Sequence, residues 1–106
     1  MADSLFRSRD AWIAAVDRAL MRADARQVLA LKDIDPEVVL SVACAEASWA
    51  TESGVSTLSH ARLAELTGHP RSAVLRARLA LVELGLEDLA AVTGAPGTCH
   101  RELRHH

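Results

Sequence analysis

A tight break between two helical patterns is the feature that most restricts the fold of this sequence. Residues 63–86 read LAELTGHPRSAVLRARLALVELGL, and the break falls at Thr67-Gly68-His69-Pro70. Glycine adopts positive φ without steric cost, so Gly68 suits a sharp turn. The pattern predicts a short helix over 60–67 and a longer helix over about 71–84.

The spacing of small and apolar residues around this break fits a helix-turn-helix. That motif needs a small residue where the helices cross, a glycine in the turn, and two apolar anchors on the second helix. These positions are occupied by Ala64, Gly68, Val74 and Ala77. The sequence therefore predicts that the second helix is held firmly against the first.

A projection of residues 71–84 at about 100° per residue predicts which side chains point outwards. The inward stripe contains Val74, Ala77, Leu81 and Leu84. The opposite side contains Ser72, Arg76, Ala80 and Glu83, with Arg71 and Arg78 on a flank. We therefore expect Arg71, Ser72 and Arg76 to be exposed at the start of this helix, where arginine suits guanine edges and phosphates.

Helical patterns also cover the N-terminal half, residues 1–54. Ser8 or Asp10 caps a helix that ends near Arg22, and residues 23–34 continue it directly or after a bend. Asp35-Pro36-Glu37 then starts a helix over about 36–50, with proline at a position where its missing N–H costs nothing. The side chains expected to face inwards are Trp12, Ile13, Val16, Ala19, Leu20, Val38, Val42, Ala45 and Trp49.

The tail, residues 86–106, allows two interpretations. Strand-like alternation at residues 98–104 favours a β-hairpin over 87–104, with its turn at Gly94-Ala95-Pro96-Gly97. The run LAAVTGAPGT also repeats LAELTGHPRS at an offset of 26 residues, which leaves a helical or partly disordered tail as the alternative.

Cysteine, histidine and tryptophan side chains are expected to be structural. Cys99, His100, His105 and His106 lack a paired CxxC or HxxxH spacing, so no metal site or cofactor is expected. Cys44 is expected in the core, and Trp12 and Trp49 are expected as packing anchors. No Ser/His/Asp spacing, P-loop or dinucleotide glycine pattern occurs, which argues against an enzyme.

Charge is distributed unevenly along a chain whose formal net charge is −2. Residues 1–54 carry six basic and nine acidic side chains, whereas residues 55–84 carry four and two. The basic surplus therefore coincides with the helix-turn-helix.

The length suits one compact domain, in which residues 1–54 complete the core and provide a dimer contact for 55–106. No signal peptide or run of about 18 apolar residues occurs, so we expect a cytoplasmic, nucleoid-associated protein with no membrane partner.

The run STLSHARLAELTGHPRSAVLRARLALVELGL, residues 56–86, resembles winged helix-turn-helix DNA-binding domains. Thr57-Leu58 matches the short first strand, and VELGL matches the exit from the recognition helix. Within that family the run is most similar to small DNA-binding proteins of actinobacterial plasmids, phages and integrated elements. The resemblance implies that the hairpin over 87–104 is a wing, with Arg101 or Arg104 contacting phosphates. Pro70 stands where the family more usually has a Ser or Thr cap.

These features predict a mainly α winged helix-turn-helix with an N-terminal helical extension and a short C-terminal β-hairpin. The expected function is binding of double-stranded DNA as a homodimer, either in transcription regulation or at the replication origin of a mobile element. The recognition helix would read the major groove through Arg71, Ser72 and Arg76. The remaining candidate DNA contacts are Arg62, His69, Arg78, Arg101 and Arg104. The alternative is a non-enzymatic protein-interaction module with the same fold, such as a phage protein that docks on the host transcription machinery.

Overall fold

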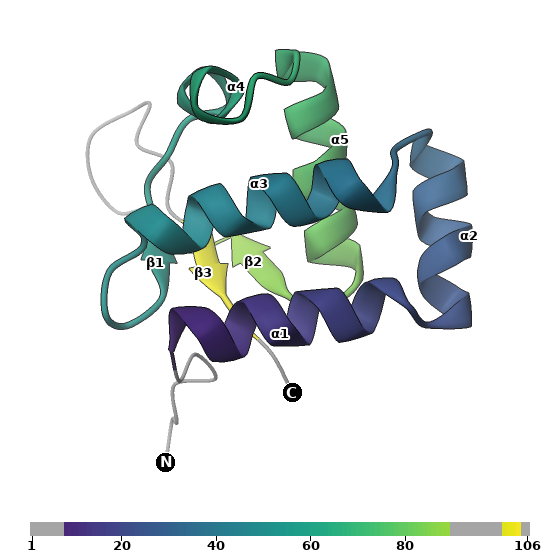
Figure 1. Cartoon of the computed structure of the whole chain (residues 1–106), viewed down its shortest axis with the longest axis horizontal. Coiled ribbons are helices and arrows are strands. Elements are labelled where there is room, and N and C mark those ends of the chain that lie inside the picture. Colours follow the sequence, from purple (N-terminus) through teal and green to yellow (C-terminus); the bar gives the residue numbers. More distant parts are fainter. Residues whose placement is uncertain (1–7, 90–100, 105–106) are drawn as a thin grey trace.

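Helices form most of the computed structural model, which describes residues 8–89 and 101–104 of the chain. A small three-stranded antiparallel sheet completes the described part, with strand order β1-β3-β2 (Figure 1). In chain order the elements are α1 (Arg9–Leu20), α2 (Ala23–Lys32), α3 (Pro36–Trp49), β1 (Val55–Ser56), α4 (His60–Thr67), α5 (Arg71–Glu83), β2 (Glu87–Leu89) and β3 (Arg101–Leu103). The mainly α class and the short hairpin strands agree with the sequence prediction.

The helices pack in layers around α3. In Figure 1, α1 and α3 lie side by side in front, α5 crosses behind α3, and α2 covers one end. One apolar core runs through the whole arrangement and draws on both halves of the sequence. Its largest fully buried apolar side chains are Trp12, Leu63, Leu81, Leu103, Val16, Val39, Val42 and Val74. The N-terminal helices are therefore part of the same core as α4 and α5.

Capping residues explain where several helices begin. The Ser8 hydroxyl accepts a hydrogen bond from the N–H of Ala11 at 3.0 Å, and the Ser59 hydroxyl accepts one from Arg62 at 3.1 Å. Each bond satisfies one of the backbone donors left over at a helix N-terminus. Asp35 occupies the cap position of α3, but its side chain forms no capping bond there. The predicted cap position is thus confirmed, whereas its hydrogen bond is not formed.

Trp12 joins α1 to the C-terminal part of the chain, which confirms the prediction that Trp12 is a packing anchor. Trp12 has no exposed surface, and its indole N–H lies 2.9 Å from the carbonyl of Leu86 and 3.0 Å from that of Arg104. Arg9 donates from Nε to the carbonyl of Ala47 at 2.8 Å, at the end of α3.

In the described part of the chain, no helix is long and apolar enough to cross a membrane.

The buried side of α3 differs from the prediction. Val42 is buried, but Trp49 is 58% exposed, so its role as an inward anchor was predicted wrongly. The helix packs against α1 on one side and against α4 and α5 on others, which widens and rotates its buried surface relative to a single stripe. That surface consists of Val39, Val42, Ala43, Glu46 and Ala47.

The strands confirm the two ends of the predicted hairpin. β2 and β3 pair antiparallel, with Glu87 opposite Leu103 and Asp88 opposite Glu102. Arg101 and Leu103 are buried while Glu102 is half-buried, so the expected alternation holds and a helical tail is wrong for residues 101–103. The predicted turn at 94–97 and the candidate metal ligands Cys99, His100, His105 and His106 lie outside the described residues.

The first strand occupies Val55–Ser56 rather than Thr57-Leu58, where the resemblance placed it. Leu58 does not pair with a strand, because its carbonyl accepts a hydrogen bond from Arg78 at 2.7 Å. Ser59 then caps α4 directly. The sheet therefore ends two residues earlier than expected, and residues 57–59 connect it to α4.

Candidate functional site

The joint between α4 and α5 has the geometry that the sequence predicted. Gly68 ends α4 with φ of 78°, and its N–H donates to the carbonyl of Ala64 at 2.9 Å. A Cβ at position 68 would meet no atom within 4 Å, so the positive φ rather than lack of space favours glycine. Val74 and Ala77 are fully buried, which confirms both as the anchors of α5.

The outward face of α5 differs from the projection. Ala80 is fully buried, although it was expected to point outwards. The reason is that α2 packs against α5 in addition to α3, so more of the helix circumference is covered. The exposed side chains of α5 are Arg71, Ser72, Leu75, Leu79 and Glu83.

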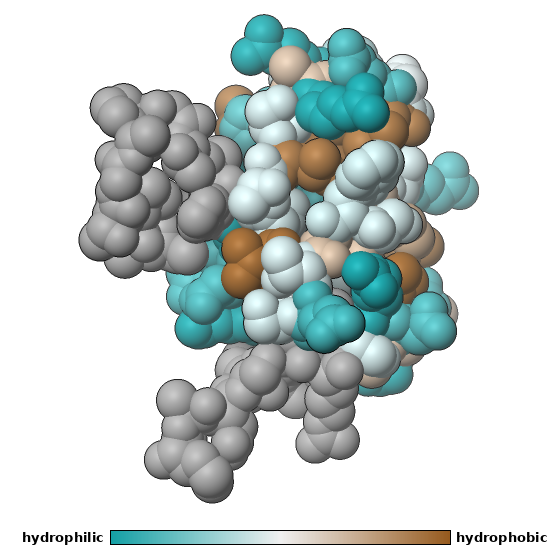
Figure 2. All heavy atoms as spheres, turned by 90° about the vertical axis from the view of Figure 1, so that its left-hand side faces the viewer, coloured by the Kyte–Doolittle hydropathy of each residue, from teal (hydrophilic) through white to brown (hydrophobic). Residues whose placement is uncertain are grey.

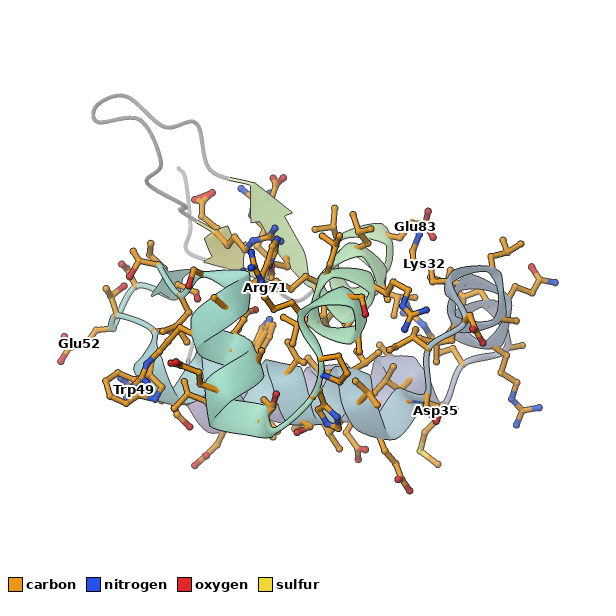
Figure 3. All side chains as sticks on the ribbon, turned by 90° about the horizontal axis from the view of Figure 1, so that it is seen from above. Lys32, Asp35, Trp49, Glu52, Arg71 and Glu83 are labelled. Carbon is orange, nitrogen blue, oxygen red and sulfur yellow. The ribbon has the colours of Figure 1, made fainter. Side chains whose placement is uncertain are left out.

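Arg71 and Ser72 lie exposed at the start of α5, as predicted. Viewed from above, Arg71 lies on the side of α5 that faces the strands, whereas Glu83 lies on the side facing α2 (Figure 3). Glu83 pairs there with Lys32 at 3.4 Å. The exposed side of α5, which we call its open face and which contains Arg71, Ser72, Leu75, Leu79 and Glu83, thus lies between the strands and α2.

Arg76 is directed towards the end of α2 rather than straight into solvent. Its guanidinium lies 3.9 Å from the carboxylate of Asp33, and its Nε is buried. The side chain still keeps 40% of its surface exposed. Arg76 therefore lies at the α2 margin of the open face, while Arg71 lies at the opposite margin.

Arg78 is fully buried, so the expectation that it contacts DNA phosphates is wrong. Its guanidinium forms an ion pair with the equally buried carboxylate of Glu46 on α3. It also lies 3.0 Å from Nδ1 of His60, in addition to its bond to the Leu58 carbonyl. A cation engaged on all sides within the core cannot reach a nucleic acid.

Arg101 is also buried, and its expected phosphate contact is wrong for the same reason. Its Nη1 donates to Oε1 of Glu87 at 2.6 Å, across the β2–β3 pair. Glu87 also lies close enough to the Glu46 carboxylate for the two acids to interact electrostatically. We call the set Glu46, His60, Arg78, Glu87 and Arg101 the buried ion cluster; it joins α3, α4, α5, β2 and β3.

The other three predicted contacts are at least partly accessible, and the two arginines among them already have partners. Arg62 pairs with Glu65 at 3.1 Å and lies over the Trp49 ring, 5.9 Å from its centroid. Arg104 lies between Asp88 at 3.2 Å and Glu102 at 3.3 Å. His69 is half-buried in the turn. Figure 3 shows Trp49 well away from Arg71, so Arg62 and Arg71 do not form one patch.

Hydrophobic surface is limited on the side that holds β1 and the end of α3. There the hydrophobic residues reach the surface only in small separate patches between hydrophilic ones (Figure 2).

Cys44, expected in the core, is half-buried on α3, and burial raises the pKa of its thiol. Within residues 8–89 and 101–104, no group of three or more His, Cys, Asp or Glu side chains is arranged to hold a metal ion.

The buried ion cluster shifts the protonation of two of its members. Burial raises the pKa of Glu87 well above its ordinary value, and the neighbouring Glu46 raises it further. Burial lowers the pKa of His60, and the nearby Arg78 and Arg101 guanidinium groups lower it further. A proton on Glu87 removes the repulsion between its carboxylate and that of Glu46 inside the core.

Stability is expected to depend on pH through Glu87. Because the pKa of Glu87 is raised in the folded state, the folded chain holds a proton that the unfolded chain loses above about pH 4.5. The stabilisation that this proton gives the folded chain is fully present below about pH 4.5, and it is lost as the pH rises through the folded-state pKa of Glu87. Glu87→Gln imitates the protonated form and does not titrate. The free energy of unfolding of the variant, relative to that of the wild type, should therefore increase as the pH rises from 4.5 to 7.

Chemical denaturation at several pH values measures this difference. Glu52→Gln, which alters an exposed glutamate, serves as the matched control and should follow the wild type throughout. A gap between Glu87→Gln and wild type that stays constant over the range would contradict the shift.

The sequence analysis did not identify Glu46, His60 or Glu87, or the two exposed leucines of α5, and it placed the two arginines of the cluster at the surface. A signal was present, because Glu46 follows Val39 and Val42 at helical spacing and Arg78 follows Val74 in the same way. A lone charge inside an apolar stripe indicates a buried ion pair when a second stripe carries the opposite charge.

No protein-family model, curated protein or solved structure matches the chain. The site therefore has to be interpreted from its own geometry.

Proposed function

We propose that the chain binds double-stranded DNA sequence-specifically as a winged helix-turn-helix, with α5 in the major groove. The observation that carries this proposal is the rigid α4–α5 joint with the first turn of α5 exposed. Gly68 sets the crossing, Val74 and Ala77 anchor α5, and Arg71 and Ser72 remain accessible. A helix held in this way presents its N-terminal side chains to base edges.

The order of the elements supports the same proposal. α3, β1, α4, α5, β2 and β3 follow one another as in a helix-turn-helix followed by a wing, with β3 between the other two strands. In this arrangement the β2–β3 hairpin acts as the wing, and Arg104 contacts a phosphate by exchanging its carboxylate partners. The acting form is a homodimer, because one recognition helix reads too few base pairs to select a single site. The biological role is transcription regulation or origin recognition in a mobile element.

Arg71→Ala is expected to weaken binding to a selected duplex by about 1–3 kcal/mol, because it removes an arginine contact to a base edge or phosphate. The measurement is fluorescence anisotropy with a duplex selected from a random library. Arg18→Ala, which removes an exposed arginine of α1, is the matched control and should leave the affinity unchanged. Equal affinities for the Arg71→Ala and Arg18→Ala variants would remove Arg71 from the interface.

A salt titration tests the function as a whole. Affinity of the wild type for random duplex should fall steeply between about 50 and 200 mM salt, since phosphate contacts release counterions. Absence of any duplex binding at 50 mM salt would rule out the proposal.

One observation favours a second candidate, a protein-interaction module. Leu75 and Leu79 are exposed on α5. Two of the arginines of the same helix, Arg76 and Arg78, already pair with carboxylates. A chain that binds no duplex but captures a protein through this face would match that candidate.

A further inference from the structure

Two leucines form an exposed apolar ridge along the middle of α5. Leu75 is 42% exposed and Leu79 is 46% exposed. By contrast, Leu81 of the same helix is fully buried in the core. The two residues are four positions apart, so they lie on the same side of the helix, one turn above the other. A single exposed leucine is common on protein surfaces. Two exposed leucines one helical turn apart on the same side of α5 form a small apolar surface.

Polar groups frame the leucine ridge, which is defined as Leu75 and Leu79. Ser72 is exposed one turn before Leu75, and Arg71 begins the same row of residues on the side facing the strands. Arg76 lies at the other margin, towards α2. The face thus has an apolar centre, a hydroxyl group at its start and a guanidinium group on each side.

This combination matches the major groove better than an apolar protein surface. The major-groove edge of thymine presents a C5-methyl group beside its O4 acceptor, and phosphates border the groove on both sides. Arginine at both margins is complementary to those phosphates, while the leucines are complementary to the methyl groups. A purely apolar partner would offer no anion to Arg71, whereas Arg76 already lies 3.9 Å from the Asp33 carboxylate.

The spacing of the ridge fits neighbouring base pairs. Four residues of α-helix rise by about 6 Å. Base pairs follow one another at about 3.4 Å along the duplex axis. Leu75 and Leu79 would therefore face bases about two steps apart.

We propose that Leu75 and Leu79 determine specificity by contacting thymine methyl groups about two base-pair steps apart in the major groove. This inference rests on the proposed function and adds the class of base that the middle of α5 selects. Arg71 and Ser72 contact the groove one turn earlier.

Deoxyuridine substitution tests the inference, because deoxyuridine differs from thymidine only in lacking the C5-methyl group. Each thymine of a duplex selected by the wild-type chain is replaced in turn, and Kd is measured by fluorescence anisotropy. Substitution at one or two thymines should weaken binding by about fourfold each, the factor expected for burying one methyl-sized group. Leu75→Ala should abolish the effect at one of these thymines, and Leu79→Ala at the other.

Leu31→Ala is the matched control, since Leu31 is an exposed leucine of α2 and is 86% exposed. It should keep the full deoxyuridine effect at both thymines. A wild-type chain that selects a duplex but tolerates deoxyuridine everywhere would overturn this inference and leave DNA binding intact. Failure to select any duplex would instead overturn the proposed function. Self-association of the wild type that Leu75→Ala abolishes in light scattering would assign the ridge to a second copy and overturn the inference.

Discussion

Replacing Arg78 with methionine is expected to lower the free energy of unfolding by about 3–5 kcal/mol, because it leaves a buried carboxylate without its cation. Arg78 and Glu46 both have fully buried side chains, and the pair connects α5 to α3. Removal of the guanidinium group also leaves the Leu58 carbonyl without the donor that reaches it at 2.7 Å. Losses of this size take a large share of the about 5–15 kcal/mol that stabilises a typical small domain.

Urea denaturation followed by circular dichroism measures the effect of Arg78→Met. Arg62→Met is the matched control: Arg62 forms an exposed pair with Glu65, and exposed pairs contribute about 0–1 kcal/mol. The double variant Glu46→Met/Arg78→Met should recover most of the loss, since a buried ion pair is often replaceable by apolar side chains of similar volume. A single variant within about 1 kcal/mol of the wild type would show that the pair is not formed as described.

The buried ion cluster also links the candidate recognition helix to the hairpin. Arg78 of α5 pairs with Glu46, and Arg101 of β3 pairs with Glu87. The two acids lie close enough to interact electrostatically. Charged groups inside the core thus contribute to the contact between α5 and the hairpin strands, together with the apolar packing of Leu81, Leu86 and Leu103. Among the described residues, Arg78 and Arg101 are therefore buried and are not available at the surface.

Local signals in the sequence were sufficient for the helix boundaries of the candidate site. The predicted short helix over 60–67 coincides with α4, and the predicted helix over 71–84 differs from α5 by one residue. Ser59, Gly68 and Pro70 act through the backbone of their own neighbours, so their effect can be inferred from the sequence around them. The same holds for the anchors Val74 and Ala77.

Orientation of the helices could not be inferred in the same way. A projection assumes one buried stripe per helix, but α5 packs against both α3 and α2, and this buries Ala80. The partners of the arginines are equally hidden, because Arg78 and Glu46 are 32 residues apart. Which charges neutralise each other inside a core depends on the packing of distant segments, and the sequence gives only their spacing.

Trp12→Ala is expected to lower the free energy of unfolding by about 3–5 kcal/mol, the range typical of a buried aromatic side chain removed from a core. The fully buried indole fills the space next to α3 and donates to the carbonyls of Leu86 and Arg104, so it holds α1 against both ends of the hairpin. Trp12→Phe keeps most of the apolar volume but removes the N–H, and should cost about 1–3 kcal/mol. Trp49→Ala is the matched control, because Trp49 is 58% exposed and its loss should change the urea midpoint little. Equal losses for the two tryptophan-to-alanine variants would contradict the different burial of these side chains.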